Sequence, residues 1–243
     1  MHIIPHSHRV YLMGDFHGHT ERLKEKLQEI TVAGGPSALI LLGDYDAHTA
    51  SDIDQLKDLL AAYSVDYYLL RGNHDNPLYW QDRGISSLFE DSYFHFLHEL
   101  DCIQWGESKI LTVNGAVSVD RTCIRFDRGN CWPDIEPVPK DAVDQIQKLR
   151  EQHGEFDVLI SHTGIIIGKT IKSEFTKSFA STDETLLEDL EKERDLMQRI
   201  QIASGVERHY FGHFHQSWRG EKYDTDCRCL DICEIIRPGY NND

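Results

Sequence analysis

Short apolar runs in the first third of the chain each lead to a glycine followed by a polar residue. The runs begin at Val10, Ala38 and Asp66, and the polar residues that follow are Asp15, Asp44 and Asn73. Between the first two runs, Leu23, Leu27 and Ile30 are spaced as on one face of a helix. Apolar runs without alternation, joined by helices, are typical of parallel strands covered on both faces. The pattern predicts an α/β fold with the order β-α-β-α-β in residues 10–70.

The rest of the chain continues the mixed pattern less regularly. We expect helices over 141–153 and 185–203 and strands over 156–160, 208–211 and 228–236. Two β-like runs flank Asn114-Gly115, a dipeptide that favours a hairpin turn. The polar stretch around 164–182 is expected to be an inserted loop over the site. Since no internal repeat or linker divides the sequence, we expect a single domain spanning residues 1–243.

The charge balance narrows the choice of partners. The chain carries a formal net charge of −16, whereas a protein that neutralises a phosphate backbone needs a basic surface. Duplex nucleic acid is therefore not an expected partner. A phosphorylated substrate is still compatible, because bound divalent cations can invert the local potential. The sequence makes no prediction of oligomeric state.

The cysteines and the hydropathy pattern bear on the compartment. The six cysteines lack the dense spacing of a secreted disulfide scaffold. Cys227, Cys229 and Cys233 are expected to be buried thiols rather than zinc ligands, since no second pair matches them. No stretch reaches the ~20 apolar residues needed to span a bilayer. We expect a cytoplasmic protein without a membrane partner.

Five polar segments, each placed directly after a predicted strand, carry the chemistry. They are Gly14-Asp-Phe-His-Gly-His19, Gly43-Asp44, Gly72-Asn-His-Asp75, Ser161-His162 and Gly212-His-Phe-His215. The carboxyl ends of strands in an open parallel sheet border one crevice, so these segments should converge. Carboxylate, imidazole and amide groups form a mixed nitrogen and oxygen set that suits manganese, iron or zinc. The sequence therefore predicts a metal site.

Taken together, the segments G-D-x-H-G, G-D, G-N-H-D, S-H and G-H-x-H resemble the calcineurin-like metallophosphoesterase superfamily, from about Val10 to His215. The resemblance implies a four-layer α/β (α+β) fold, a β-sandwich flanked by helices, and an enzyme that hydrolyses phosphoesters. It also implies two divalent metal ions, with manganese as the first choice and iron, zinc or nickel as alternatives.

The resemblance also implies individual roles. One ion would be held by Asp15, His17, Asp44 and His215. Asp44 would bridge to a second ion, also held by Asn73, His162 and His213. His74 would lie beside the phosphate and protonate the leaving oxygen, a role commonly worth ~10²–10⁴-fold in rate. Asp75 is a candidate for orienting an imidazole, or else a turn residue.

The substrate class depends on which cationic side chain binds the phosphate. The run Leu70-Arg-Gly-Asn-His74 resembles the Ser/Thr protein phosphatases, but their G-D-x-x-D-R-G motif is replaced here, with Ala47 and His48 in the places of its acid and arginine. Arg121 and Arg125 are candidate replacements that could bind phosphate bidentately, or else form ion pairs with the many acids.

Three functional hypotheses follow. An arginine clamp favours a phosphomonoesterase acting on a phosphoprotein or a small phosphometabolite, and this is the first prediction. An open, uncharged leaving-group side would favour a phosphodiesterase or a dinucleoside-polyphosphate hydrolase. A non-catalytic scaffold on the same fold is the third hypothesis.

Overall fold

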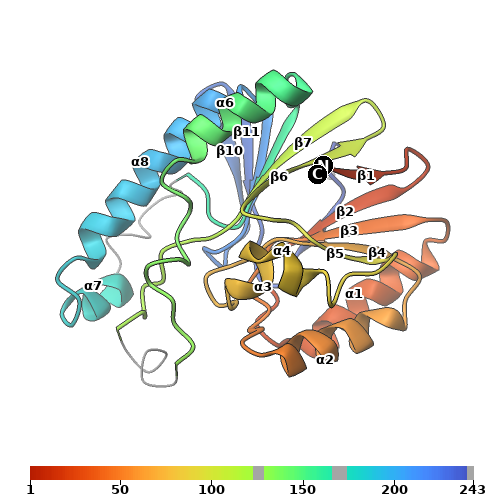
Figure 1. Ribbon diagram of the computed structural model, residues 1–243, viewed down its shortest axis with the longest axis horizontal. Helices are drawn as coiled ribbons and strands as arrows, with labels where there is room; N and C mark the ends of the chain where they lie inside the picture. The colour runs from red at the N-terminus through yellow and green to blue at the C-terminus, as the bar shows by residue number, and fades with distance from the viewer. Residues whose placement is uncertain (123–128, 166–173, 240–243) are drawn as a thin grey trace.

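The computed structural model describes residues 1–122, 129–165 and 174–239, and the strands in these ranges form two sheets (Figure 1). The five-stranded sheet has the order β12-β2-β3-β4-β5, with strands Ile235–Ile236, Arg9–Met13, Ser37–Leu41, Asp66–Leu69 and Phe94–Phe96. The seven-stranded sheet has the order β1-β6-β7-β8-β9-β11-β10, with strands His2–Ile4, Leu100–Trp105, Ser108–Val113, Val158–Ser161, Arg208–Phe211, Thr225–Cys229 and Trp218–Lys222.

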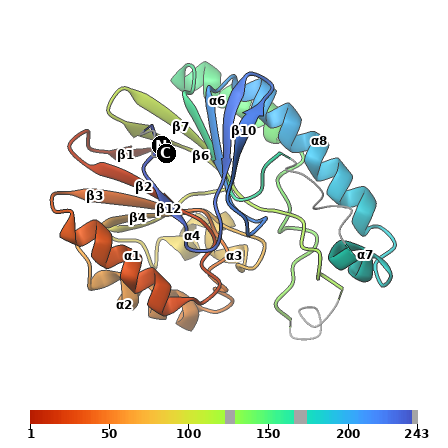
Figure 2. The same cartoon turned by 180° about the vertical axis from the view of Figure 1, so that it is seen from behind.

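Helices cover the outer faces of both sheets, so the molecule has four layers (Figures 1 and 2). Helices α1 (Thr20–Val32) and α2 (Ala50–Ala61) share a core with the outer face of the five-stranded sheet. Helices α6 (Ala142–His153) and α8 (Leu186–Ser204) pack on the seven-stranded sheet. Three short helices, α3 (Leu78–Gln81), α4 (Arg83–Ser86) and α7 (Glu174–Ala180), complete the described helices. The predicted β-sandwich flanked by helices is confirmed.

Strand β3 shows why its apolar run does not alternate. Leu39 and Leu41 pack against the α1 and α2 side, whereas Ala38 and Ile40 belong to the core between the two sheets. Both faces of the strand are therefore dry, and burial of apolar surface stabilises both at ~25 cal/mol per Å². The strand pairs in parallel with β2 and β4, which brings the carboxyl ends of all three strands to the same edge.

Two predicted strand segments were wrong, and both errors arise at turns. The hairpin turn of β6 and β7 lies at Gly106, whose φ is 58°, and not at Asn114-Gly115, which follows β7. The region 228–236 is not one strand, because β11 ends at Cys229 and β12, in the other sheet, begins at Ile235. A turn at Tyr223 and Asp224 joins β11 to the unpredicted β10. Both of these residues have positive φ, as a type I′ turn requires, without the glycine that would have revealed it.

The predicted inserted loop around 164–182 is only partly described, since residues 166–173 lie outside the described residues. Its later part forms the short helix α7. None of the helices in the described ranges is long and apolar enough to cross a membrane. Cys227, Cys229 and Cys233 are free and buried, as predicted.

Candidate metal centre

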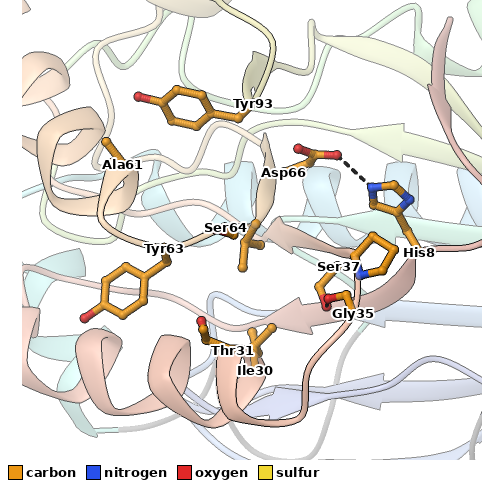
Figure 3. A pocket seen from close by; sticks show the side chains of 12 residues that line it. His8, Ile30, Thr31, Gly35, Ser37, Ala61, Tyr63, Ser64, Asp66 and Tyr93 are labelled. Atoms are coloured by element: carbon orange, nitrogen blue, oxygen red, sulfur yellow. Dashed lines mark hydrogen bonds and ion pairs between the residues drawn. The ribbon is translucent and has the colours of Figure 1, made fainter.

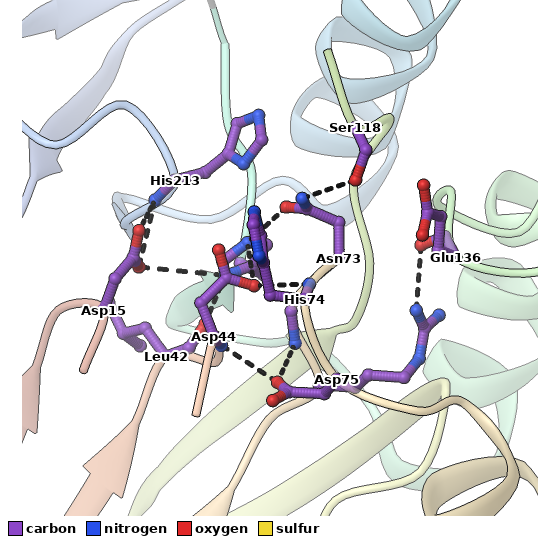
Figure 4. Close-up of polar contacts among 12 residues, drawn as sticks. Asp15, Leu42, Asp44, Asn73, His74, Asp75, Ser118, Glu136 and His213 are labelled. Carbon is purple, nitrogen blue, oxygen red and sulfur yellow. Dashed lines mark hydrogen bonds and ion pairs between the residues drawn. The ribbon is translucent and has the colours of Figure 1, made fainter. Parts of the chain in front are cut away.

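The seven predicted metal ligands lie in loops at the carboxyl ends of strands from both sheets. Those of the five-stranded sheet are Asp15 and His17 after β2, Asp44 after β3 and Asn73 after β4. Those of the seven-stranded sheet are His162 after β8 and His213 and His215 after β9. Six of them form two groups that share Asp44 and whose ligand atoms lie within 4.8 Å of one another. The seventh, Asn73, contacts the second group. Figure 4 shows four of the seven ligands, Asp15, Asp44, Asn73 and His213.

The first group has the spacing of atoms around one cation. His17 Nε2 lies 2.9 Å from His215 Nε2 and 3.4 Å from Asp44 Oδ2. His215 Nε2 lies 3.2 Å from Asp15 Oδ2. Two atoms that bind the same ion at ~2.1 Å and at right angles are ~3 Å apart. The carboxylates and imidazoles of this group therefore fit a divalent cation in both chemistry and spacing.

The second group is centred on His162. Its Nε2 lies 3.0 Å from Asn73 Oδ1 and 3.4 Å from Asp44 Oδ1, while its Nδ1 bonds the Leu42 carbonyl oxygen at 2.7 Å. A backbone carbonyl on one ring nitrogen turns the other nitrogen toward the site, as is common for metal-binding histidines. With His213, this group also fits a divalent cation.

The buried carboxylates of these two groups favour positive charge on the groups around them. Burial alone would raise the pKa of Asp44. The neighbouring imidazolium charges of His162, His74 and His17 outweigh burial, so the net pKa lies well below the ordinary value. Burial lowers the pKa of His17 and of His162, yet the surrounding carboxylates bring both to about 9. The buried carboxylates thus attract either protons or cations. A divalent ion would displace these protons, as metal binding generally does.

The backbone of the site loops is held in conformations that side chains disfavour. The non-glycine residues here with positive φ are His17 at 43°, Asp44 at 55°, Asp46 at 59°, His213 at 64° and His215 at 50°. Such residues cost free energy and cluster at functional sites. Close approach adds a further constraint, because a Cβ at Gly72 would lie 2.0 Å from Asp44 Oδ1.

Asp75 is fully buried and holds the site loops together through their backbone. Its carboxylate accepts hydrogen bonds from the amides of Asp44 at 2.9 Å, Tyr45 at 2.8 Å, Ala47 at 3.3 Å and Gly72 at 2.9 Å. Burial, followed by the charge of Asp44, raises the pKa of Asp75 to about 7. These bonds join the loops after β3 and β4, and none of them reaches an imidazole, so the contacts do not support the predicted orienting role.

A further acid beside the imidazoles of His17 and His74 is Asp46, which sequence reasoning missed. Its Oδ1 lies 3.4 Å from His74 Nδ1 and 3.7 Å from His17 Nδ1. Burial alone would raise the pKa of Asp46. Hydrogen bonds with both histidines outweigh burial and bring the pKa below its ordinary range. The available signal was the second acid of Gly43-Asp-Tyr-Asp46, one position before the acid of the protein-phosphatase motif.

The two predicted phosphate-binding arginines are placed differently. Arg121 is nearly buried and donates to both Asp183 oxygens at 2.7 and 3.2 Å and to Asp189 at 2.8 Å. Its Nη2 also donates to Thr185 Oγ1 at 2.9 Å, which ties the arginine to the start of α8. Arg125 lies outside the described residues.

A cavity of about 580 Å³ lies at the opposite edge of the five-stranded sheet (Figure 3). It is lined by the ends of α1 and α2, by Tyr63 and Tyr93, and by His8 and Asp66, whose side chains lie 3.1 Å apart. None of the predicted site residues that the structure describes lines it, and the predicted metal ligands lie at the other edge of the sheet.

Comparison with known proteins agrees with this architecture. The model of the calcineurin-like phosphoesterase family matches residues 8–217, and the chain belongs to that family. It is therefore a hydrolase of phosphoesters from a metal-dependent family. A search of curated proteins gives no match.

Solved structures resemble the fold at low sequence identity. A dimetal phosphatase from Danio rerio is 10% identical, with a TM-score of 0.58 over 93% of this chain and 88% of that chain. Phosphopantetheinyl hydrolase from Mycobacterium tuberculosis is 14% identical, with a TM-score of 0.53 over 94% of this chain and 91% of that chain. At these identities the likeness extends to the fold alone.

Proposed function

We propose that this chain hydrolyses phosphoesters at a centre of two divalent metal ions, with manganese as the native metal. The observation that carries the proposal is the position of Asp44 between the two groups of side chains. Its Oδ2 faces His17 Nε2 and its Oδ1 faces His162 Nε2, each at 3.4 Å. A carboxylate whose two oxygens face separate groups is suited to bridge two ions. The mixed nitrogen and oxygen set favours manganese over calcium or magnesium.

The residues divide into those that would hold ions and those that would meet the substrate. When bound, the ions would neutralise phosphoryl charge and lower the pKa of a water molecule. Asp15 and Asp44 are buried and would provide the negative charge that retains cations, whereas the His74 side chain is 26% exposed. This exposure supports His74 as a residue that would meet the substrate.

His74 acts in this proposal as the general acid. Its backbone amide donates to Asp44 Oδ1 at 2.9 Å, which fixes the residue beside the bridging carboxylate. Its Nδ1 faces Asp46, so its Nε2 is the end that can carry a proton to the leaving oxygen. A carboxylate at Nδ1 fixes the orientation of the ring and stabilises its protonated form.

Asp46 takes over the orienting role predicted for Asp75. We expect Asp46→Asn to slow turnover of esters with poor leaving groups more than turnover of aryl phosphates, because the loss acts through His74. Steady-state kinetics across a series of leaving groups would measure this effect. Equal loss for all leaving groups would contradict the orienting role.

The substrate class rests on the arginines. The phosphomonoesterase prediction needs a cationic clamp, and Arg121 is already bound by Asp183 and Asp189. Support for the clamp therefore rests on Arg125. The ion pairs of Arg121 favour a second candidate, a phosphodiesterase or dinucleoside-polyphosphate hydrolase, since a monoanionic diester needs less positive charge than a dianionic monoester.

One screen distinguishes these candidates. Manganese-loaded protein would be assayed side by side with phosphomonoesters, phosphodiesters, dinucleoside polyphosphates and phosphopeptides, with metal content measured on each preparation. Asp44→Asn serves as the control that should lose metal and activity together. Turnover of any class supports the hydrolase, and the preferred class decides between the candidates. If the protein binds two ions but hydrolyses none of these substrates, the result would support the scaffold hypothesis instead.

A further inference from the structure

Residues 114–118, here called the 114–118 arm, leave the end of β7 and run to the metal centre. The backbone amides of Asn114, Gly115, Ala116 and Val117 donate in turn to Glu99 O, Arg71 O, Glu136 O and Glu193 Oε1, at 3.0, 3.0, 3.0 and 2.7 Å. All five residues of the arm are buried. Each step of the arm is thus fixed by a different part of the molecule, including α8 through Glu193.

The conformation of Gly115 lets the arm pass close to its neighbours. Its φ is 92°, and a Cβ there would lie 2.5 Å from Glu136 O. Only glycine adopts this conformation without strain and leaves this space open. The Asn-Gly pair that suggested a hairpin therefore serves to direct the arm toward the site.

The arm ends on Asn73. Ser118 Oγ accepts a hydrogen bond from Asn73 Nδ2 at 2.7 Å (Figure 4). Asn73 Oδ1 faces His162 Nε2 at 3.0 Å. An amide binds a metal ion through its oxygen, because its nitrogen is a donor only. Which end of the Asn73 amide faces the second group of ligands therefore decides whether Asn73 can bind an ion.

We propose that Ser118 is a positioning residue that holds the Asn73 amide with its oxygen toward the second ion, and that the 114–118 arm holds Ser118 in place. The inference rests on the proposed two-ion centre. Outer partners that orient a metal ligand are commonly worth 10–100-fold in metal affinity. Ser118 bonds Asn73, and among the described residues it has no recorded contact with the first group, so its effect should be confined to one of the two ions.

Titration of metal-free protein with Mn²⁺ alone tests the proposal. We expect Ser118→Ala to weaken the affinity for the second Mn²⁺ ion by roughly 10–100-fold and to leave the affinity for the first ion unchanged. Ser204→Ala is the matched control, because Ser204 is equally buried but bonds Gln201 O on α8. The loss should disappear when Asn73→Asp is combined with Ser118→Ala, since either oxygen of a carboxylate can bind the ion.

Other outcomes would overturn the proposal. Ser118→Ala with wild-type affinity for both ions, or with equal loss of both, would show that Ser118 does not act through Asn73. The same fold-loss in the Asn73→Asp background would lead to that conclusion too. A wild-type protein that binds only one Mn²⁺ would instead reject the two-ion centre itself, which separates the two failures.

Discussion

Glu193 is a buried carboxyl whose ionisation should govern stability at alkaline pH. It lies on α8, is 8% exposed, and accepts the Val117 amide at 2.7 Å. Burial raises its pKa from an ordinary 4.5 to about 8, despite backbone donors that lower it. The folded state therefore binds this proton more tightly than the unfolded state. The stabilisation is complete below pH 4.5 and is lost as pH rises through about 8.

The size of the effect follows from that difference in pKa. At 1.36 kcal/mol per pKa unit, a carboxyl with these two values loses about 4 kcal/mol of folding stability between pH 5 and pH 8.5. Glu193→Gln keeps the shape and the acceptor but cannot ionise. The free energy of unfolding of the variant should therefore rise relative to wild type by about 4 kcal/mol across this range.

Urea denaturation at pH 5, 6.5 and 8.5, at constant Mn²⁺, measures this difference. Glu188→Gln on the same helix is the control, because the Glu188 side chain is 68% exposed and pairs with Lys192. The control should show little dependence on pH. A wild-type minus Glu193→Gln difference that is constant from pH 5 to 8.5 would refute the buried, protonated state of Glu193.

Three further variants test the site. Asp44→Asn should lose more than one ion's worth of metal by elemental analysis, because Asp44 faces both groups; full occupancy would reject the bridge. His74→Ala should keep its metal and lose most turnover on poor leaving groups, with a smaller defect on aryl phosphates. Collapse of metal binding would mean that the roles of Asn73 and His74 are reversed. Arg121→Ala should lower the free energy of unfolding by about 3 kcal/mol, since it removes the partner of the buried Asp183 and of the partly exposed Asp189. A selective fall in the monoester-to-diester activity ratio of folded protein would instead assign Arg121 to phosphate.

Sequence predicted the parts of the fold that depend on repeated burial. The runs at β2, β3 and β4 are continuous and apolar because helices cover one face and the second sheet covers the other. The polar residues after them were recognisable because they interrupt these runs at glycines. Placing them at strand ends was enough to predict that they converge.

Sequence failed where the structure depends on a single backbone or side-chain direction. The turn at Tyr223 and Asp224 adopts positive φ without glycine, so β10 went unpredicted. Asp46 reaches His74 because its own φ is 59°, a conformation that residue type does not reveal. The sequence left Asp75 open between an orienting residue and a turn residue, because adjacency to His74 in sequence does not fix where a carboxylate points.

The division of the ligands between two sheets makes the chemistry sensitive to the spacing of the sandwich. Leu12, Ile40 and Ile160 fill the core between the sheets, two to four residues before predicted ligands of the same strands. Truncating one of them would let the sheets relax toward each other or leave a void. Either change would alter the separation of the ligands across the centre. Apolar residues with no contact to metal or phosphate would then act as determinants of metal affinity, and natural variation in this layer would tune the enzyme without touching its polar residues.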